Sequence, residues 1–186
     1  MASDESLFNG LKARDPEAFE WLVNRFEGQL FRYFICEHRD YHRAEEQVAE
    51  TLLEFTKSVH TIQGNFEQLA GFVFGIARNI RMRHWRHQRA NKTIDQQRVD
   101  VELLVDSHLS SASQLESRDQ IDQILGLIGQ FQDQMRDVLL FRFVEGYSLQ
   151  QISELLNMPL GSVKSHIHRG ITKLREILSH TDCHHE

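Results

Sequence analysis

Apolar residues recur along most of the chain at intervals of three and four, the spacing that buries one face of an α-helix. Asp15 and Pro16 mark a helix start, because Asp suits the N-cap and Pro suits the first helical position. The pattern predicts one helix from Pro16, a second over about 41–60 and a third over about 66–90. Strand and hairpin signals are nearly absent, so we expect an all-α fold.

The composition changes between two helical groups. Residues 91–117 are rich in Gln, Asp and Ser, which is typical of a linker. We therefore expect two small helical domains joined by an acidic linker, followed by a short tail. The expected bounds are 1–90 for the first domain, 91–117 for the linker, 118–180 for the second domain and 181–186 for the tail.

Charge is distributed unevenly along these segments. The formal net charge of the 186 residues is −6, which by itself argues against a nucleic-acid ligand. However, residues 78–92 hold six Lys and Arg and no acid, and residues 162–175 hold four and no acid. Residues 93–137 hold nine acids against three bases. The order basic, acidic, basic indicates two separate anion-binding surfaces.

One face of the helix expected over about 66–90 combines basic and aromatic residues. At about 100° per residue, the face opposite the apolar stripe carries Arg78, Arg81, Trp85 and Arg89, with Phe74 beside them. Guanidinium groups bind phosphates and aromatic rings stack on bases, so this face suits single-stranded DNA. The alternative for Trp85 is packing against a neighbouring helix or the linker.

The C-terminal part has the pattern of a helix-turn-helix. Ser148 and Gln151 form a capping box at the start of a short helix, and residues 157–161 form the turn. The longer helix that follows has a polar and basic face, as a major-groove reader requires. This face carries Ser162, Ser165, His168, Arg169 and Thr172, flanked by Lys164, His166 and Lys173. An antiparallel helix pair in a bundle is the alternative interpretation.

The sequence lacks the common motifs of enzymes and cofactor sites. It has no Gly-rich phosphate loop, no His-Glu-x-x-His and no nucleophile elbow, and Cys36 and Cys183 show no paired-ligand spacing. We therefore expect neither an enzyme nor a bound metal or cofactor. The His and Cys residues of the tail, His180 to Glu186, could ligate a metal, but a polar tail without metal is the favoured interpretation.

Hydropathy does not predict membrane insertion. No apolar run approaches the roughly 20 residues that a spanning helix needs. The acidic start, with Asp4 and Glu5, does not fit a signal peptide. We expect a soluble protein of the cytoplasm.

Five short motifs stand out in two stretches of the chain. The first stretch holds AFEWL at 18–22, RAEEQVAETL at 43–52 and GIARN at 75–79. The second holds VLLFRFVEGYS at 138–148 and PLGSVKS at 159–165. They resemble region 2 and region 4, respectively, of RNA polymerase sigma factors of the extracytoplasmic-function (ECF) branch of the sigma-70 family. Their order, their spacing and the linker between them also match the family.

The resemblance implies an alternative sigma factor that binds core RNA polymerase, at its clamp helices and flap, and directs it to particular promoters. Region 2 would melt the −10 element of the promoter. Region 4 would place its second helix in the major groove of the −35 element. An anti-sigma factor is a further partner that the family allows.

Carried over position by position, the resemblance assigns three sets of contacts. Polymerase binding falls to Glu45, Glu46, Glu50 and Glu54. Capture of an unstacked −10 base is assigned to the loop with Gln63 and Asn65. Binding of the DNA strand beside this base is assigned to Arg78, Arg81, Trp85 and Arg86. The −35 element would be read by Ser162, Ser165, His168 and Arg169, with Lys164 and Lys173 on phosphates.

The chain departs from the family at several positions. Arg43 stands where Asp is common, Gln47 where Leu is common, and Gly129 near a position that is often Pro. Phosphorylation of Thr51 or Thr56, in the polymerase-binding helix, would add about −1.5 to −2 charges and tune docking.

Two other functions are compatible with the sequence. One is a stand-alone helix-turn-helix repressor or activator that binds duplex DNA as a dimer. The other is a protein that only sequesters polymerase. Within the favoured interpretation, the acidic linker would shield the basic faces of the free protein and make its DNA binding conditional on polymerase.

Overall fold

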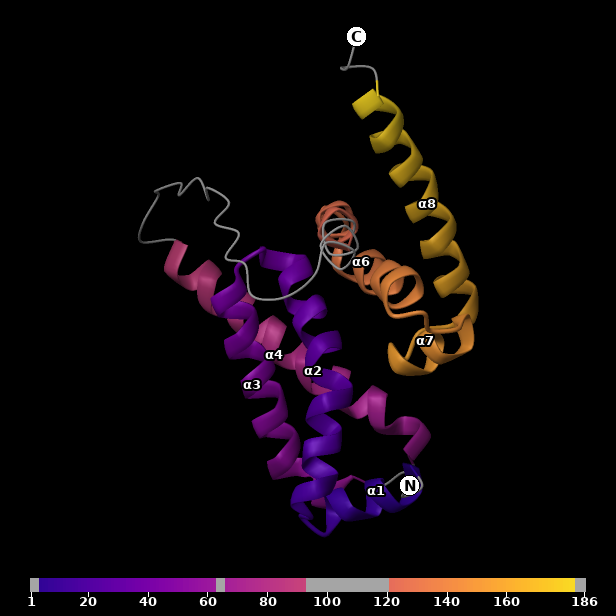
Figure 1. The fold of residues 1–186 in the computed structure, drawn as a ribbon. Coiled ribbons are helices and arrows are strands. Elements are labelled where there is room, and N and C mark those ends of the chain that lie inside the picture. Colours follow the sequence, from indigo (N-terminus) through magenta and orange to yellow (C-terminus); the bar gives the residue numbers. More distant parts are fainter. Residues whose placement is uncertain (1–3, 63–65, 93–120, 183–186) are drawn as a thin grey trace, which may run out of the picture.

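The computed structural model describes residues 4–62, 66–92 and 121–182, and these residues form helices and no strand. The N-terminal bundle consists of α1 (Asp4–Lys12), α2 (Pro16–His38), α3 (Tyr41–Ser58) and α4 (Leu69–Lys92). Two 3₁₀ turns, η1 (Val59–Thr61) and η2 (Phe66–Gln68), lie between α3 and α4. In Figure 1 the long helices α2 and α3 run side by side, and α1 lies across one end of the bundle.

Local signals explain where the bundle helices begin and end. The Asp15 side chain accepts a hydrogen bond from the Glu17 backbone N–H at 3.0 Å, and Pro16 is the first residue of α2, as the sequence predicts. Arg39 ends α2 in the left-handed conformation, with φ 53°. Asp40 then caps α3 through the Arg43 backbone N–H at 3.1 Å. The helix expected from Pro16 and those expected over about 41–60 and 66–90 are therefore confirmed, within a few residues at the bounds that were given.

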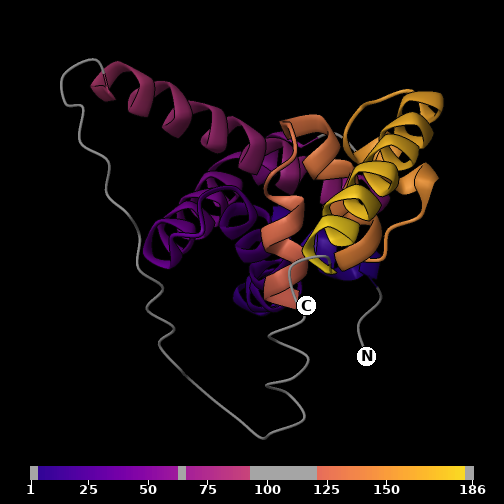
Figure 2. The ribbon, with the colours of Figure 1, turned by 90° about the horizontal axis from the view of Figure 1, so that it is seen from above.

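The C-terminal helices follow in the same chain. Residues 121–128 are helical, and α6 (Asp133–Leu139) continues into η3 (Leu140–Val144), a π-helical segment. The helix α7 (Leu149–Leu155) and the long helix α8 (Leu160–Asp182) complete this part. Figure 2 shows α8 crossing over α6 on the side away from α3. At this crossing a Cβ on Gly170 would lie 2.7 Å from a Leu139 methyl group, so any larger residue there would force the buried Leu139 side chain to shift.

An aromatic cluster joins the two parts of the chain. Phe141 of η3 is 0% exposed, and its ring centroid lies 4.7 Å from that of Phe74 on α4 and 6.1 Å from that of Tyr33 on α2. Tyr147 also packs against Phe141, edge to face, with centroids 5.8 Å apart. These contacts bury Phe74, which the helical wheel places beside the basic face of α4. The C-terminal helices, rather than solvent, cover this part of α4.

Gln47 is a polar residue inside the bundle. Its side chain on α3 is 0% exposed, and neither amide atom has a hydrogen-bond partner among the residues that the structure describes. An unsatisfied buried polar group costs about 1–3 kcal/mol.

Replacing Gln47 by leucine, the residue common at this position in the resembling family, is therefore expected to raise the free energy of unfolding by about 1–3 kcal/mol. Urea unfolding followed by circular dichroism measures the change. Gln68→Leu is the control, because Gln68 is exposed and its replacement is expected to change stability by less than about 0.5 kcal/mol. Equal or lower stability of Gln47→Leu would contradict the prediction.

Candidate nucleic-acid interface

The exposed part of the α4 basic face carries three of the side chains expected to bind the −10 strand. Arg78, Trp85 and Arg86 are exposed, with Trp85 at 47%. They lie on the C-terminal two thirds of α4, which extends away from the bundle in Figure 2. Gln63 and Asn65, expected to capture the unstacked base, lie outside the described residues, as do residues 93–117 of the linker expected over 91–117.

Arg81 does not lie on this exposed face, and its expected exposure is wrong for this conformation. The side chain is 4% exposed. Its Nη1 and Nη2 donate to the two carboxylate oxygens of Asp137 on α6, at 2.7 and 3.0 Å. The guanidinium also lies over the Tyr33 ring, 4.7 Å from the centroid. The wheel places Arg81 opposite the apolar stripe correctly, but that side of α4 is where the C-terminal helices dock.

Arg81 and Asp137 belong to a larger buried group, which we call the interdomain cluster: Glu37 of α2, Arg81 of α4, and Arg136 and Asp137 of α6. Glu37 Oε2 lies 3.6 Å from both Arg81 Nε and Arg136 Nη2. Arg136 also donates to Asp133, at 2.7 Å, at the edge of the cluster. Two cations thus face the buried carboxylate of Asp137 and the largely buried carboxylate of Glu37, so the cluster has a formal charge of zero. Such pairing is what allows charges to be buried at all.

Burial and pairing have opposite effects within this cluster. Burial raises the pKa of Glu37, although the charges of Arg136 and Arg81 act to lower it. Burial acts to lower the pKa of Arg81, but the charge of Asp137, the neighbouring Tyr33, the hydrogen bonds to Asp137 and the charge of Glu37 together outweigh it, so the pKa of Arg81 is raised and the guanidinium stays charged. Burial also raises the pKa of the neighbouring Cys36 thiol to about 12. This thiol donates to the Leu125 carbonyl oxygen at 3.4 Å, so it too lies at the junction.

A second ion pair crosses the junction. Arg32 on α2 donates from Nε and Nη2 to the two carboxylate oxygens of Glu145, at 2.7 and 2.9 Å. Tyr147 donates its hydroxyl to the Gln29 amide oxygen at 3.0 Å. Gly129 lies against the Cys36 carbonyl oxygen so closely that a Cβ would overlap it. The family often has a proline near this position. Here the position is a glycine, and the Gly129 backbone lies close to the Cys36 backbone.

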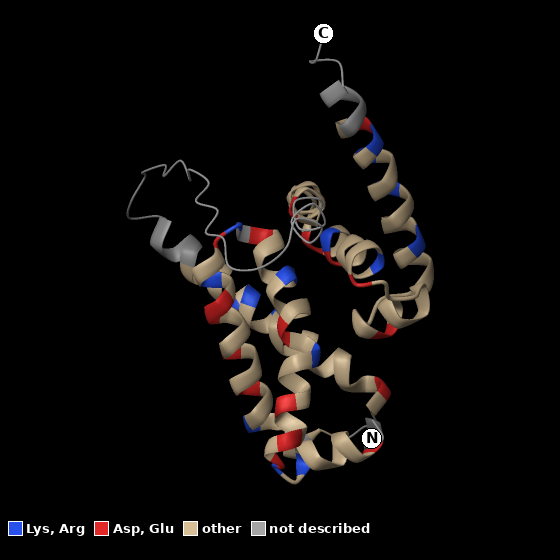
Figure 3. Cartoon of the chain, in the orientation of Figure 1, with Lys and Arg blue, Asp and Glu red and all other residues tan. Residues whose placement is uncertain are grey.

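The acidic residues expected to bind polymerase lie on α3, where Figure 3 shows Asp and Glu recurring along the helix. Glu45 and Glu46 are exposed. Glu54 accepts a hydrogen bond from Lys57 at 3.2 Å and is half-exposed. Glu50 is different, because Arg83 and His84 of α4 both pair with its carboxylate. Its charge is largely compensated within the bundle.

The two threonines considered as phosphorylation sites differ in access. Thr51 is 0% exposed and donates its hydroxyl to the Gln47 carbonyl oxygen at 2.7 Å, so a kinase cannot reach it in this fold. Thr56 is partly exposed and donates to the Leu53 carbonyl oxygen at 2.7 Å.

The helix-turn-helix forms as the sequence predicts. Ser148 accepts a hydrogen bond from the Gln151 backbone N–H, and the Gln151 side chain accepts one from the Ser148 backbone N–H, which completes the capping box. Asn157 ends α7 with φ 48°, a left-handed conformation that Asn tolerates. The first residue of α8 is Leu160, directly after Pro159.

The exposed face of α8 carries most of the residues expected to read the −35 element. Lys164, Ser165, His168, Arg169 and Lys173 are exposed. Lys and Arg are spread along this helix in Figure 3. Burial, and then the charge of Arg169, lower the pKa of His166, so its ring is neutral near pH 7 and adds no fixed charge there.

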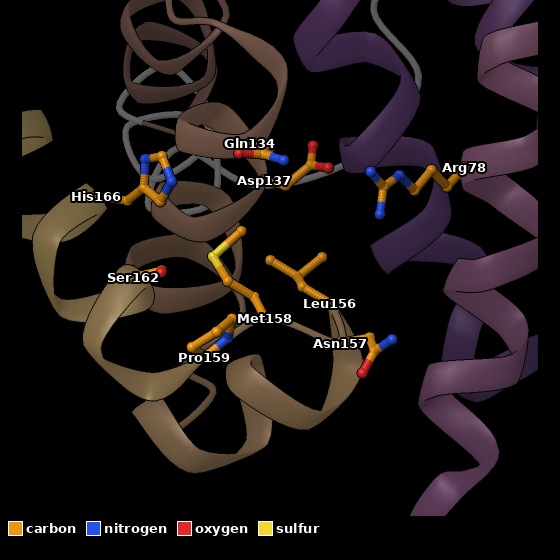
Figure 4. Close-up of a pocket in the computed structure, with 9 residues that line it drawn as sticks. All are labelled: Arg78, Gln134, Asp137, Leu156, Asn157, Met158, Pro159, Ser162 and His166. Atoms are coloured by element: carbon orange, nitrogen blue, oxygen red, sulfur yellow. The ribbon is translucent and has the colours of Figure 1, made fainter.

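Ser162 faces the N-terminal bundle instead. It is half-buried and lines a pocket of about 300 Å³ together with His166, Asp137 and Arg78. Figure 4 shows Arg78 of α4 on the opposite side of this pocket from Ser162 and His166 of α8. A second pocket of about 320 Å³ shares Arg78 and also lies between α4 and α7. One expected −10 contact and one expected −35 contact thus line the same space.

The residues that sequence reasoning missed are the acidic partners across the junction, Asp137 and Glu145. Asp137 lies at the end of the acidic stretch and Glu145 within an apolar one. Asp137 pairs with Arg81, which is 56 positions away, and Glu145 pairs with Arg32, which is 113 positions away. Helical periodicity carries no information on such distant pairs.

Neither metal binding nor membrane insertion gains support from the described part of the chain. Among these residues no group of three or more His, Cys, Asp or Glu is placed to hold a metal ion. Side chains of the His and Cys tail lie outside the described residues. None of the described helices combines the length and the apolar character needed to cross a bilayer.

Comparison with known proteins agrees with this geometry. Residues 121–174 match the family model "Sigma-70, region 4", which spans the C-terminal helices up to the middle of α8. The ECF RNA polymerase sigma factor SigX of Bacillus subtilis (strain 168) is 24% identical over 86% of this chain and 83% of its own. The ECF RNA polymerase sigma factor SigW of the same organism is 24% identical over 90% of this chain and 92% of its own.

The fold also matches a solved structure, that of CnrH in complex with the cytosolic domain of CnrY. The TM-score is 0.63 at 17% identity, with coverage of 95% of this chain and 97% of that chain. The order of helices, the helix-turn-helix within the matched region 4 and the two relatives aligned over most of their length agree: the chain is similar to the ECF sigma factors of the sigma-70 family.

Proposed function

We propose that this protein is an alternative sigma factor that binds core RNA polymerase and directs promoter-specific initiation of transcription. The observation that carries the proposal is the exposed basic face of α8, which follows a capped helix and a tight turn inside the segment that matches region 4. A second basic face on α4, in the same chain, supports contacts with two promoter elements.

Polymerase binding is assigned to α3 in the proposed function. Glu45, Glu46 and Glu54 present carboxylates on the exposed side of the helix. The exposed Leu53, at 55%, lies among them and adds apolar contact area. Glu50 contributes less charge, because Arg83 and His84 already pair with it. The C-terminal helices would bind the polymerase flap.

The −10 strand is assigned to α4 and to the loop before it. Arg78 and Arg86 would hold phosphates, and Trp85 offers a ring on which a base stacks. Gln63 and Asn65 would hold the extracted base, a step that costs a few kcal/mol. Arg81 can join this surface only after it leaves Asp137.

The −35 element is assigned to the N-terminal half of α8. Ser165, His168 and Arg169 would reach base edges in the major groove, while Lys164 and Lys173 would contact phosphates. Ser162 would join them once the pocket beside α4 opens.

Control by an anti-sigma factor is part of the proposal, because the fold matches CnrH, whose solved structure contains the cytosolic domain of CnrY. A protein with this function acts with RNA polymerase in the cytoplasm and catalyses no reaction itself.

Transcription in vitro tests the function. Core polymerase from the native cell is combined with the purified protein and a library of promoter fragments, and run-off transcripts are sequenced. Transcripts that start at shared sites only when the protein is present are expected. Binding to duplex DNA without polymerase, with no transcripts, would favour the dimeric repressor or activator; polymerase binding without transcripts would favour sequestration.

Arg169→Ala is expected to weaken −35 recognition. Loss of an arginine contact with a base edge costs about 1–3 kcal/mol of binding free energy. Footprinting of the polymerase complex measures protection over the −35 element. Arg175→Ala, which removes the same charge from an exposed position farther along α8, is expected to leave the footprint unchanged. Equal footprints for both variants would contradict the assignment.

A further inference from the structure

Every polar group of Arg81 that could bind DNA contacts a carboxylate of the protein instead. Two guanidinium nitrogens bond the two Asp137 oxygens, the third lies 3.6 Å from Glu37, and the flat face lies on the Tyr33 ring. The side chain is 4% exposed. A carboxylate and a phosphate present similar paired oxygens to a guanidinium. Asp137 therefore occupies the position that a DNA phosphate would take on Arg81.

We propose that the interdomain cluster is an autoinhibitory latch: in the free protein Asp137 of α6 substitutes for a DNA phosphate on Arg81, and Arg81 becomes available only when the C-terminal helices separate from the bundle. The inference rests on the proposed function for its consequence in transcription. The docking itself is a property of the free chain.

The latch withdraws parts of both DNA surfaces at once. Ser162 of α8 faces the pocket that Arg78 closes from the α4 side. Phe74 of α4 is covered by Phe141. Docking therefore reduces access to the proposed DNA-binding faces of α4 and α8 together, and separation of the two parts restores access to both.

The physical basis of the latch is competition for one guanidinium. The cluster is neutral when docked, since Arg81 and Arg136 face Glu37 and Asp137. Buried ion pairs of this kind are close to break-even against solvation in water. A strong anion such as a phosphate can therefore replace Asp137 on Arg81 with little change in ion-pair energy, and binding to polymerase or DNA must offset the cost of exposing Phe141 and Tyr33. DNA binding and docking of the C-terminal helices on the bundle are then thermodynamically linked, and each weakens the other.

The buried thiol of Cys36 provides the readout of docking. Its Sγ donates to the Leu125 carbonyl oxygen, so the C-terminal helices cover it, and burial raises its pKa to about 12. Separation uncovers the thiol and permits labelling by a disulfide reagent. Cys183→Ser in all variants leaves Cys36 as the only cysteine, since the chain has two.

The test compares Asp137→Asn with Asp122→Asn. Both remove one negative charge from the C-terminal helices, but Asp122 is exposed and outside the cluster. Asp137→Asn is expected to accelerate Cys36 labelling, and to tighten binding of a mixed-sequence single-stranded oligonucleotide by the free full-length chain, each by about tenfold or more. Fluorescence anisotropy measures the binding, and circular dichroism checks that helicity is retained.

Further variants separate the latch from a general loss of structure. Adding Arg81→Ala to Asp137→Asn should leave labelling fast but remove most of the gain in DNA affinity. Glu145→Gln, which breaks the second ion pair without altering the cluster, should accelerate labelling as well and serves if Asp137→Asn loses helicity. In the parent chain, added oligonucleotide should accelerate labelling.

The outcomes are decisive in both directions. Labelling and DNA affinity of Asp137→Asn equal to those of Asp122→Asn would overturn the latch, as would a gain in affinity that survives Arg81→Ala. Neither measurement uses polymerase. A failed latch therefore leaves the sigma-factor proposal standing, and absence of promoter-specific transcripts leaves the docking result intact.

Discussion

Phe141→Ala is expected to lower the free energy of unfolding by about 3–5 kcal/mol, the usual cost of removing a buried phenylalanine ring. Phe141 is 0% exposed and its ring contacts Tyr33, Phe74 and Tyr147. No single neighbour can fill the space that the ring leaves, because the three aromatic groups are fixed on α2, on α4 and after η3. Urea unfolding of the full chain, followed by circular dichroism, measures the loss.

Phe143→Ala is the matched control. Phe143 lies two residues away on the same π-helical segment but is 49% exposed. Its replacement is expected to change stability by less than about 0.5 kcal/mol. Similar losses for the two variants would mean that the Phe141 ring is not the centre of the junction between the bundle and the C-terminal helices.

Arg81→Ala is expected to cost about 3–5 kcal/mol, because it leaves the buried Asp137 carboxylate without its partner. The Asp137 side chain is 5% exposed, and the only other cation within the interdomain cluster, Arg136, is shared with Glu37 and Asp133. Separation of the two parts does not avoid the cost, because it exposes Phe141 and Tyr33 to water. The loss is measured by urea unfolding.

A double variant identifies the cause of that loss. Replacing both members of the pair by apolar residues, Arg81→Met with Asp137→Leu, removes the unpaired charge, and such replacements of buried pairs are often neutral or stabilising. We expect the double variant to recover most of the stability that Arg81→Ala loses. A double variant as unstable as the single one would show that Arg81 acts through its packing on Tyr33 rather than through Asp137.

Much of the fold could be predicted from local signals. Asp15, Ser148 and Gln151 define helix starts through bonds to residues two or three positions away, and these bonds are present. The apolar stripes of α2 and α3 likewise follow from periodicity. The helix α1 was not anticipated, because its nine residues contain few apolar positions.

The site was only partly predictable, and the failures have one cause. Periodicity identifies the side of a helix that its nearest neighbours cover, but it does not show whether a distant segment covers the other side. Arg81 and Phe74 both lie on the side expected to be exposed, and α6 and η3 cover both. Glu50 looks like a free carboxylate in the sequence, yet Arg83 and His84 of α4 pair with it.

The placement of Asp137 and Arg81 on separate parts of the chain bears on how chimeric regulators are built. A hybrid that joins residues 1–92 of this protein to the C-terminal helices of a relative would lose the carboxylate that Arg81 binds, unless the relative supplies an acid at the same place. Promoter preference and DNA binding by the free protein would then change together, even though only the C-terminal helices were exchanged. Transplanting the acid along with α8, the helix proposed to read DNA, is expected to keep the two properties separate.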